Sequence, residues 1–167
     1  NSETKQLTVS GMGDIHLDVV CAKLKSKYGV TAELFEPKIA YREAIKKPVQ
    51  VEGKHKKQSG GSGQYGHVKI TFSPGVEDGL TFTTSVVGGN VPKNYYPAVE
   101  KGLLEAIQKG VLAGFPVVNL AADLFDGSYH AVDSNEISFK LAAKLAYKEL
   151  VKANPVILEP VGALKVT

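Results

Sequence analysis

The sequence has one cysteine, no tryptophan and no long apolar run, and these scarcities narrow the class of protein. Among its 167 residues the single cysteine, Cys21, cannot form an internal disulfide, which agrees with a reducing compartment. No stretch approaches the roughly 18 consecutive apolar residues of a membrane-spanning helix, and the first residues lack the pattern of a signal peptide. We therefore expect a soluble, cytoplasmic chain that makes no membrane contact.

An excess of charge of one sign is also lacking, since the formal net charge is only +3. A surplus this small does not by itself indicate a nucleic-acid partner. The basic residues are concentrated, however, because Lys38 to Lys57 contains seven basic and two acidic side chains. This stretch leads into Gln58 to His67, a loop with four glycines and no acid. Cations beside bare backbone suit contact with phosphate, although a charge run by itself is more often a solvated surface.

The first part of the chain predicts a strand, a helix and a second strand. We expect strands at Gln6 to Ser10 and at Val30 to Phe35, with a helix between them. The helix has Asp14 as a possible N-cap and Gly29 as its stop. Its apolar face is expected to be Leu17, Cys21, Leu24 and Tyr28. Because one helix and two strands cannot close a core, we expect residues 1–38 to be the second half of a larger domain.

The remaining chain predicts an α+β domain at about residues 39–159, with two helices on one face of a sheet. Alternating apolar residues predict strands around Val49, around Ile70 and around Phe82, and a fourth strand from about Phe115 to Phe125. One helix is expected to open at Pro92 or Pro97, to present Tyr96, Val99, Leu103 and Ile107, and to stop at Gly110. Its Gly102 predicts close packing. A last helix is expected to begin with Asp133 and Glu136 as a capping box and to present Ile137, Leu141 and Leu145, flanked by Ala142, Ala143 and Ala146 for close approach to a sheet.

Several catalytic motifs are absent or misplaced. Gly61 to Val68 matches G-x-G-x-x-G, but charged residues precede it and a predicted strand follows it, which is wrong for a dinucleotide-binding turn. No Walker motif occurs, and the four histidines are too scattered to predict a metal site. Ser128, His130 and Asp133 could be assembled into a hydrolase constellation, but no nucleophile elbow supports them. We therefore expect no catalysis and no metal within these residues.

Two loops are expected to meet. The glycine loop follows the strand at 48–56, and the loop Phe125 to Asn135 follows the strand at 115–125. If these two strands are parallel, both loops emerge at the same end of the sheet and form one tip. The bland alternative for the second loop is an ordinary turn, which its Asp-Gly pair favours.

Many short motifs resemble, in the same order, those of the bacterial translation elongation factor G family. They cover nearly the whole chain and include Gly11 to Asp18, Tyr41 to Glu43, Gly53 to Gly61, Gly63 to Val68, Val87 to Gly89, Tyr96 to Val99, Gly114 to Val117, Asp126 to His130, Val132 to Ser134 and Leu158 to Pro160. One departure is Ser62, which stands where family members commonly carry arginine.

The resemblance implies that residues 1–38 end the factor's third domain, 39–159 form its fourth and 160–167 begin its fifth. The fold implied is similar to the second domain of ribosomal protein S5, with a left-handed β-α-β crossover, preceded by a partial ferredoxin-like domain. The implied activity is translocation of tRNA and mRNA, in which the fourth domain mimics the anticodon arm of tRNA and enters the decoding site of the small ribosomal subunit. GTP and magnesium would bind the full-length protein outside this chain. The protein is expected to be a monomer.

The residues implied at the tip are Ser59, Gly60, Gly61, Ser62, Gly63, Gln64, Tyr65, Gly66, Ser128, Tyr129, His130 and Asp133, with basic support from Lys54, Lys56 and Lys57. The glycines would let backbone amides approach RNA, and the lysines would attract phosphate without reading bases. Two alternatives stay open: a paralogue that acts in ribosome recycling, and a stand-alone RNA-binding module. An enzyme is the weakest interpretation.

Overall fold

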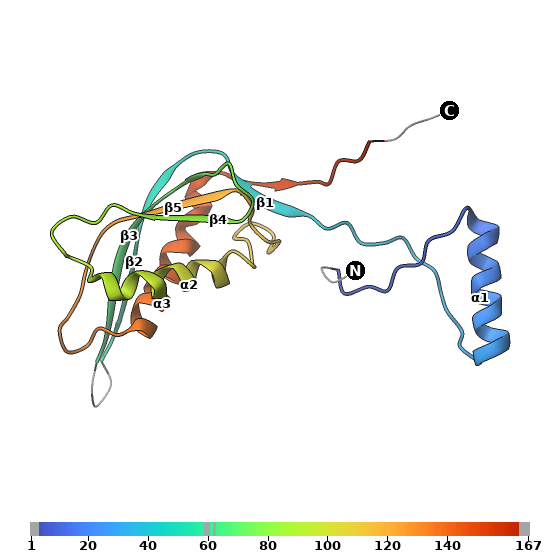
Figure 1. Cartoon of the computed structure of the whole chain (residues 1–167), viewed down its shortest axis with the longest axis horizontal. Coiled ribbons are helices and arrows are strands. Elements are labelled where there is room, and N and C mark those ends of the chain that lie inside the picture. The colour runs from blue at the N-terminus through green and yellow to red at the C-terminus, as the bar shows by residue number, and fades with distance from the viewer. Residues whose placement is uncertain (1–3, 59–60, 62, 164–167) are drawn as a thin grey trace. The chain divides into compact units, whose positions relative to one another are not determined.

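The computed structural model describes residues 4–58, 61 and 63–163. The chain divides into two compact units, Asn1–Ala40 with Pro160–Thr167 and Tyr41–Glu159. The second unit contains all six strands and two of the three α-helices of the described residues. The remaining helix, α1, is drawn in blue in Figure 1.

The first unit contains the helix α1 (Asp14–Tyr28) between two extended segments. Gly13 occupies the N-cap position, so Asp14 is the first helical residue instead of the expected cap. Gly29 ends the helix in the left-handed region at φ 67°, as predicted, and its amide donates to Lys25 O. The amide of Lys38 donates to Gln6 Oε1 at 2.8 Å, which ties the two extended segments together.

Two strands predicted for this unit are wrong. Residues 6–10 and 30–35 are extended, but neither belongs to a sheet in the described part of the chain. An extended segment becomes a strand only when a neighbour completes its hydrogen-bond ladder. Of the predicted helix face, Leu17, Cys21 and Leu24 are half-buried, whereas Tyr28 is exposed. The weak alternation of apolar residues from Val161 to Val166 predicts a further strand, but residues 164–167 lie outside the described residues.

The second unit is built on a four-stranded sheet with the order β2-β3-β5-β4. Its strands are β2 (Val49–Lys57), β3 (Gln64–Pro74), β4 (Leu80–Thr84) and β5 (Leu120–Ser128). Neighbours are antiparallel except β4 and β5, which are parallel. The three strands predicted from alternation are confirmed, and β4, α2 and β5 form the β-α-β crossover that the resemblance implies.

The fourth strand starts later than predicted, at Leu120 instead of about 115. The preceding residues use their backbone groups elsewhere, because the amide of Val117 donates to Ile107 O and that of Val118 donates to Glu43 O. Asn119 then adopts a left-handed conformation at φ 53°, which separates this segment from β5.

A second, two-stranded sheet pairs β1 (Arg42–Ile45) with β6 (Pro155–Leu158) in antiparallel register. Sequence reasoning missed both strands. Each is four residues long, which is too short to show a clear alternation of apolar and polar positions.

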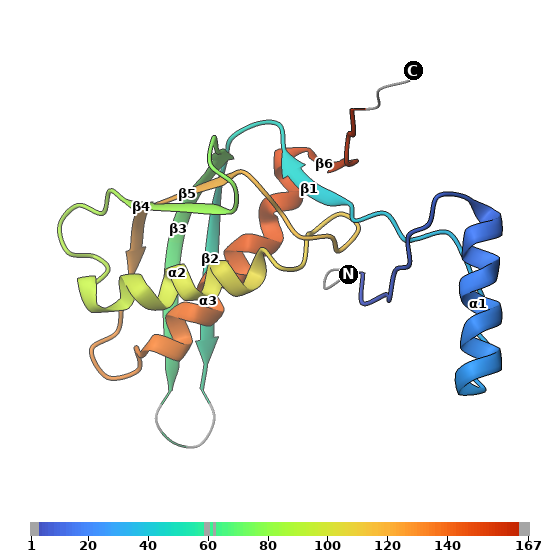
Figure 2. The same cartoon turned by 45° about the vertical axis from the view of Figure 1, so that its right-hand side comes forward.

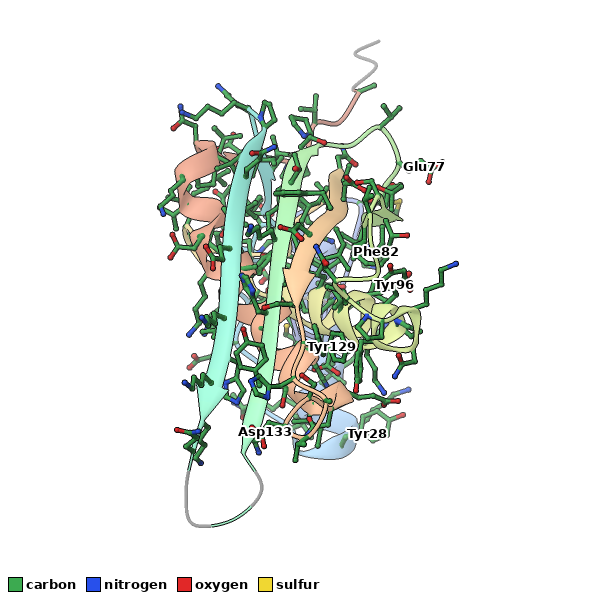
Figure 3. The ribbon with its side chains drawn as sticks, turned by 90° about the vertical axis from the view of Figure 1, so that its left-hand side faces the viewer. Tyr28, Glu77, Phe82, Tyr96, Tyr129 and Asp133 are labelled. Carbon is green, nitrogen blue, oxygen red and sulfur yellow. The ribbon has the colours of Figure 1, made fainter. Side chains whose placement is uncertain are left out.

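Two helices cover one face of the four-stranded sheet (Figure 2). The short helix η1 (Lys93–Tyr95) leads into α2 (Tyr96–Ala106), which has Pro97 in its first turn as predicted. The last helix, α3 (Glu136–Lys148), continues as η2 (Glu149–Ala153). The fold class is therefore the predicted one, an α+β domain with two helices on one face of the sheet. Figure 3 looks onto the opposite, open face of the sheet, with the helices behind the strands.

The start and part of the packed face of α3 differ from the prediction. Asn135 is the N-cap, and its side chain accepts the amide of Ser138, so Asp133 and Glu136 do not form a capping box. Ile137 is exposed, and the buried face carries Phe139 and Tyr147, which were not predicted, together with Ala142, Ala143 and Ala146, whose predicted close approach to the sheet is confirmed. The alanines replace the larger aliphatic residues because backbone must approach backbone here. A Cβ at Gly53 would lie 2.1 Å from Ala142 O, and one at Gly102 would lie 2.8 Å from Lys140 O.

The core lies between the sheet and these helices. Its largest fully buried side chains are those of Phe72, Phe139, Ile70, Leu103, Leu120 and Leu124. They come from the strands β3 and β5 and from the helices α2 and α3, so the sheet holds a fixed position beneath the helices.

Candidate nucleic-acid interface

The two loops expected to meet do lie together at one end of the sheet. Because β2 and β5 are both antiparallel to β3, they run in the same direction, and the chain that follows each one emerges at the same end. The amide of Tyr65 donates to Asp133 O at 2.8 Å, and the amide of Gly63 donates to Asp133 Oδ1 at 3.0 Å. Figure 3 shows Asp133 beside the end of the β2–β3 hairpin. We call the described residues 61, 63–66 and 128–134 the tip.

Ser134 adds a second connection between the loops. Its hydroxyl donates to Tyr65 O at 2.8 Å and accepts the amide of His130 at 2.8 Å. The amide of Ser134 in turn donates to His130 O, which closes a tight turn. Sequence reasoning missed Ser134 as a tip residue, although it stands beside Asp133 in a motif that supported the resemblance.

His130 is the most accessible polar side chain of this turn that the structure describes. Its side chain is 65% exposed, and Nδ1 lies 3.9 Å from Asp133 Oδ2. Its ring lies 5.4 Å from the Tyr65 ring, centroid to centroid, at an angle of 60°. His130 is therefore held on one side by the protein and presents its other ring nitrogen to solvent, where it can donate or accept a hydrogen bond. Its neighbour Tyr129 is also exposed.

Three lysines stand beside the tip on the last residues of β2. Lys54, Lys56 and Lys57 are exposed, and among the described residues none of them forms an ion pair. Lys54 Nζ lies 5.8 Å from the centroid of the Tyr65 ring, close enough for a cation–π contact. These exposed ammonium groups give the tip a local positive charge that the small net charge of the chain conceals.

Farther along the same face, the charges are neutralised. Lys69 Nζ lies 2.8 Å from Asp126 Oδ2, and Asn90 donates to Asp126 Oδ1 at 3.0 Å. The hydrogen bonds from Lys69 and Asn90 hold the pKa of Asp126 well below its ordinary range. The hydrogen bond to Asp126 in turn raises the pKa of Lys69. The positive charge on this face is therefore concentrated at the end that carries the tip.

At two glycines of the tip, contacts within the protein leave no room for a side chain. A Cβ at Gly66 would lie 2.3 Å from Ser138 O of α3, and a Cβ at Gly63 would lie 2.9 Å from the Asp133 carboxylate. Sequence reasoning attributed both glycines to close approach by RNA and missed this packing within the protein. Gln64 is also engaged, because its Oε1 lies 2.9 Å from His55 Nε2.

Other predicted tip residues differ in what the structure shows of them. Ser59, Gly60 and Ser62 lie outside the described residues, and Gly61 is exposed. A hydrolase site built from Ser128, His130 and Asp133 would need a hydrogen bond between Ser128 and His130, and the structure shows none. Its hydroxyl lies 2.8 Å from Tyr65 OH and 2.7 Å from His67 Nδ1 instead. The role of the tip in binding RNA stays a prediction.

Within residues 4–58, 61 and 63–163, no group of three or more histidine, cysteine or acidic side chains is arranged to hold a metal ion. No helix in those ranges is both long enough and apolar enough to cross a membrane.

The second unit is an α+β domain in which two loops are joined beside exposed lysines at one end of the sheet, and comparison with known proteins identifies the family. A family model described as Elongation factor G, domain IV matches residues 37–154, and one described as Elongation Factor G, domain III matches residues 1–36. The chain therefore belongs to the elongation factor G family.

Individual relatives agree with this assignment. Elongation factor G of Fervidobacterium nodosum is 50% identical over all of this chain, which corresponds to 24% of that protein. A crystal structure from Thermus thermophilus matches 93% of this chain and 23% of its own, with a TM-score of 0.81 and 45% identity. The chain thus spans about a quarter of the length of the relatives that it matches.

Proposed function

We propose that this chain belongs to an elongation factor G-type GTPase that promotes movement of tRNA and mRNA through the ribosome. The tip would enter the decoding site of the small subunit, where it would contact rRNA and the codon–anticodon helix. Membership of the family supports this role, and so does the geometry of the tip.

The observation that carries the proposal is the joining of the two loops through Asp133 beside three exposed lysines. A surface with accessible ammonium groups and an accessible imidazole can bind phosphates and the shallow minor groove of an RNA helix without reading a base sequence. Such indifference to sequence suits a factor that must act on every codon.

The assignment of domains follows the same proposal. Residues 1–38 would end the third domain, 39–159 would form the fourth, and 160–167 would begin the fifth. GTP and magnesium would bind a part of the full-length protein outside this chain, and the protein would work as a monomer in the cytoplasm. A stand-alone RNA-binding module is not favoured, because both family models and the relative belong to elongation factor G.

The test replaces His130 by alanine in the full-length protein. We expect single-turnover translocation to slow by roughly 3- to 10-fold, the effect of one lost hydrogen bond, while ribosome-stimulated GTP hydrolysis stays unchanged. A pair of lysine variants provides a matched comparison. Lys56→Ala should weaken ribosome binding in a salt-dependent way, whereas Lys47→Ala, at the far end of β2 from the tip, should not.

Equal loss of translocation and GTP hydrolysis in the His130 variant would count against the assignment of the tip. A recycling assay run beside the translocation assay separates a general translocase from a paralogue. The paralogue is indicated if the wild-type protein splits ribosomes but does not move tRNA.

A further inference from the structure

The open face of the sheet carries a row of contacts that runs into the tip. Tyr65 OH lies 2.8 Å from Ser128 Oγ, and Ser128 Oγ lies 2.7 Å from His67 Nδ1. On the other side of the ring, His67 Nε2 lies 2.8 Å from Glu52 Oε1. Glu52, His67, Ser128 and Tyr65 come from three neighbouring strands, so the row crosses the sheet.

The contact with Glu52 fixes where His67 carries its proton. The Nε2 atom is buried, and its contact with the carboxylate is short but not aligned as a hydrogen bond. A bare nitrogen lone pair would be repelled by a carboxylate oxygen at 2.8 Å, whereas an N–H group is attracted to it. Nε2 therefore bears a proton, and in the neutral ring Nδ1 is an acceptor.

This tautomer sets the direction of every other hydrogen in the row. Nδ1 accepts the proton of the Ser128 hydroxyl, and Ser128 Oγ then accepts the proton of Tyr65 OH. The Tyr65 hydroxyl is thereby directed inward, and its ring is held beside His130, 5.4 Å away. Lys54 lies on the same ring, 5.8 Å from its centroid. The row thus fixes the aromatic support of the most exposed polar group of the tip.

The charged groups of this face around His67 are Glu52 and Lys54 of β2, Lys69 of β3 and Asp126 of β5. Lys69 and Asp126 neutralise each other, which leaves Glu52 as the acid in contact with the ring.

We propose that Glu52, His67 and Ser128 are positioning residues of the tip, which hold Tyr65 against His130 through a directed row of contacts. They act through Tyr65 and need not touch RNA themselves. The row itself depends only on the geometry of this chain, and its importance for translocation rests on the proposed function.

The first test is nuclear magnetic resonance of the chain with labelled histidine nitrogens and labelled tyrosine Cζ atoms. In the neutral ring, His67 should be the tautomer with its proton on Nε2, and the Tyr65 Cζ signal should be that of a phenol whose hydroxyl donates a hydrogen bond. A neutral His67 with its proton on Nδ1 would overturn the proposal without any variant.

Variants then isolate the hydroxyl. Ser128→Ala should shift the Tyr65 Cζ signal, because the Tyr65 hydroxyl loses its acceptor, whereas Ser128→Thr should leave the signal close to that of the wild type. Ser85→Ala removes a hydroxyl that donates to Asp123 on the same face and should leave the Tyr65 signal unchanged. An unshifted Tyr65 signal in Ser128→Ala would show that Tyr65 does not bond to Ser128 and would overturn the proposed row.

Activity of the full-length protein provides the second test. Ser128→Ala should slow single-turnover translocation by about 2- to 10-fold without changing GTP hydrolysis, and Ser128→Thr should restore most of the rate. If Ser128→Ala is as fast as the wild type while His130→Ala is slow, the positioning role is wrong although the tip assignment stands. If both variants are fast while the His67 tautomer and the Tyr65 signals are as expected, the row exists and the proposed function of the tip fails.

Discussion

The buried carboxylate of Glu43 is expected to be a large single contributor to the stability of the second unit. Glu43 is fully buried at the start of the domain, and it accepts the amides of four consecutive residues. Its Oε1 lies 2.8 Å from the amides of Ala113 and Gly114 and 3.0 Å from that of Phe115, while Oε2 lies 3.0 Å from the amide of Leu112. The perturbation is Glu43→Ala, with Glu43→Gln as the isosteric variant.

The loss of stability in Glu43→Ala follows from the four buried amides that lose their acceptor. Each buried amide without an acceptor costs about 1–3 kcal/mol, and the four effects overlap because the loop can relax as one piece. We therefore expect Glu43→Ala to lower the free energy of unfolding by about 4 kcal/mol. Glutamine can place its oxygen at the position of Oε1 and keep three bonds, but its NH2 group then faces the amide of Leu112. Since Gly110 lies directly against the carboxyl group, the side chain cannot turn away, and we expect a loss of about 2 kcal/mol.

The assay is urea unfolding followed by tyrosine fluorescence, which reports mainly on this unit because six of the seven tyrosines lie within Tyr41–Glu159. Glu77→Gln is the matched control, since Glu77 is exposed in the turn before β4 and should unfold like the wild type. The reasoning is refuted if Glu43→Gln lies within about 0.5 kcal/mol of the wild type at an unchanged m-value, or if it is as unstable as Glu43→Ala.

Three further predictions concern separate contacts. Hydrogen bonds from Lys140 and Lys144 lower the pKa of Glu105 from 4.5 to about 2, so its contribution to stability is present above pH 4.5 and is lost as the pH falls toward 2. The difference in urea midpoint between the wild type and Glu105→Gln should shrink over that range. Gly66→Ala should lower the free energy of unfolding by about 1–3 kcal/mol, because its Cβ would overlap the backbone of α3, and thermal denaturation would reveal this. Asp133→Ala should speed hydrogen exchange of the Gly63 amide, which donates to the Asp133 carboxylate. Asp133→Asn should preserve much of the protection of that amide from exchange.

The sequence predicts the central strands because each shows its burial directly. Val68, Ile70 and Phe72 alternate with polar residues, and the structure buries each of them completely. The strands of the small sheet carry no such signal, because each has only four residues and depends on a partner that is remote in the chain. Helix α3 shows a different limit. Its leucines and isoleucine predict one face, but the alanines beside them allow the closer approach that Gly53 requires.

The tip, too, is predictable from the sequence only in part. The direction of β2 and β5 is enough to predict that their following loops meet. The residues that join those loops are not predictable from spacing, since Asp133 has the sequence features of a helix cap. The structure gives the cap to Asn135, which leaves Asp133 free to accept the amide of Gly63. Which of these two neighbouring polar side chains caps α3 therefore depends on the amide of Gly63, which stands just before the distant strand β3.

The alternation of β3 explains why one short segment carries both the packing and the chemistry of the tip. Gly66 and Val68 face α3, where backbone contact leaves no room for a larger residue at 66. Tyr65 and His67 face the open side, where they meet Ser128 from the neighbouring strand. A change on either side of this strand therefore displaces the other, because the two sets share one backbone. Gly66 thus brings α3 against the sheet, and the side chains of Tyr65 and His67 on either side of it are held at fixed positions on the open face.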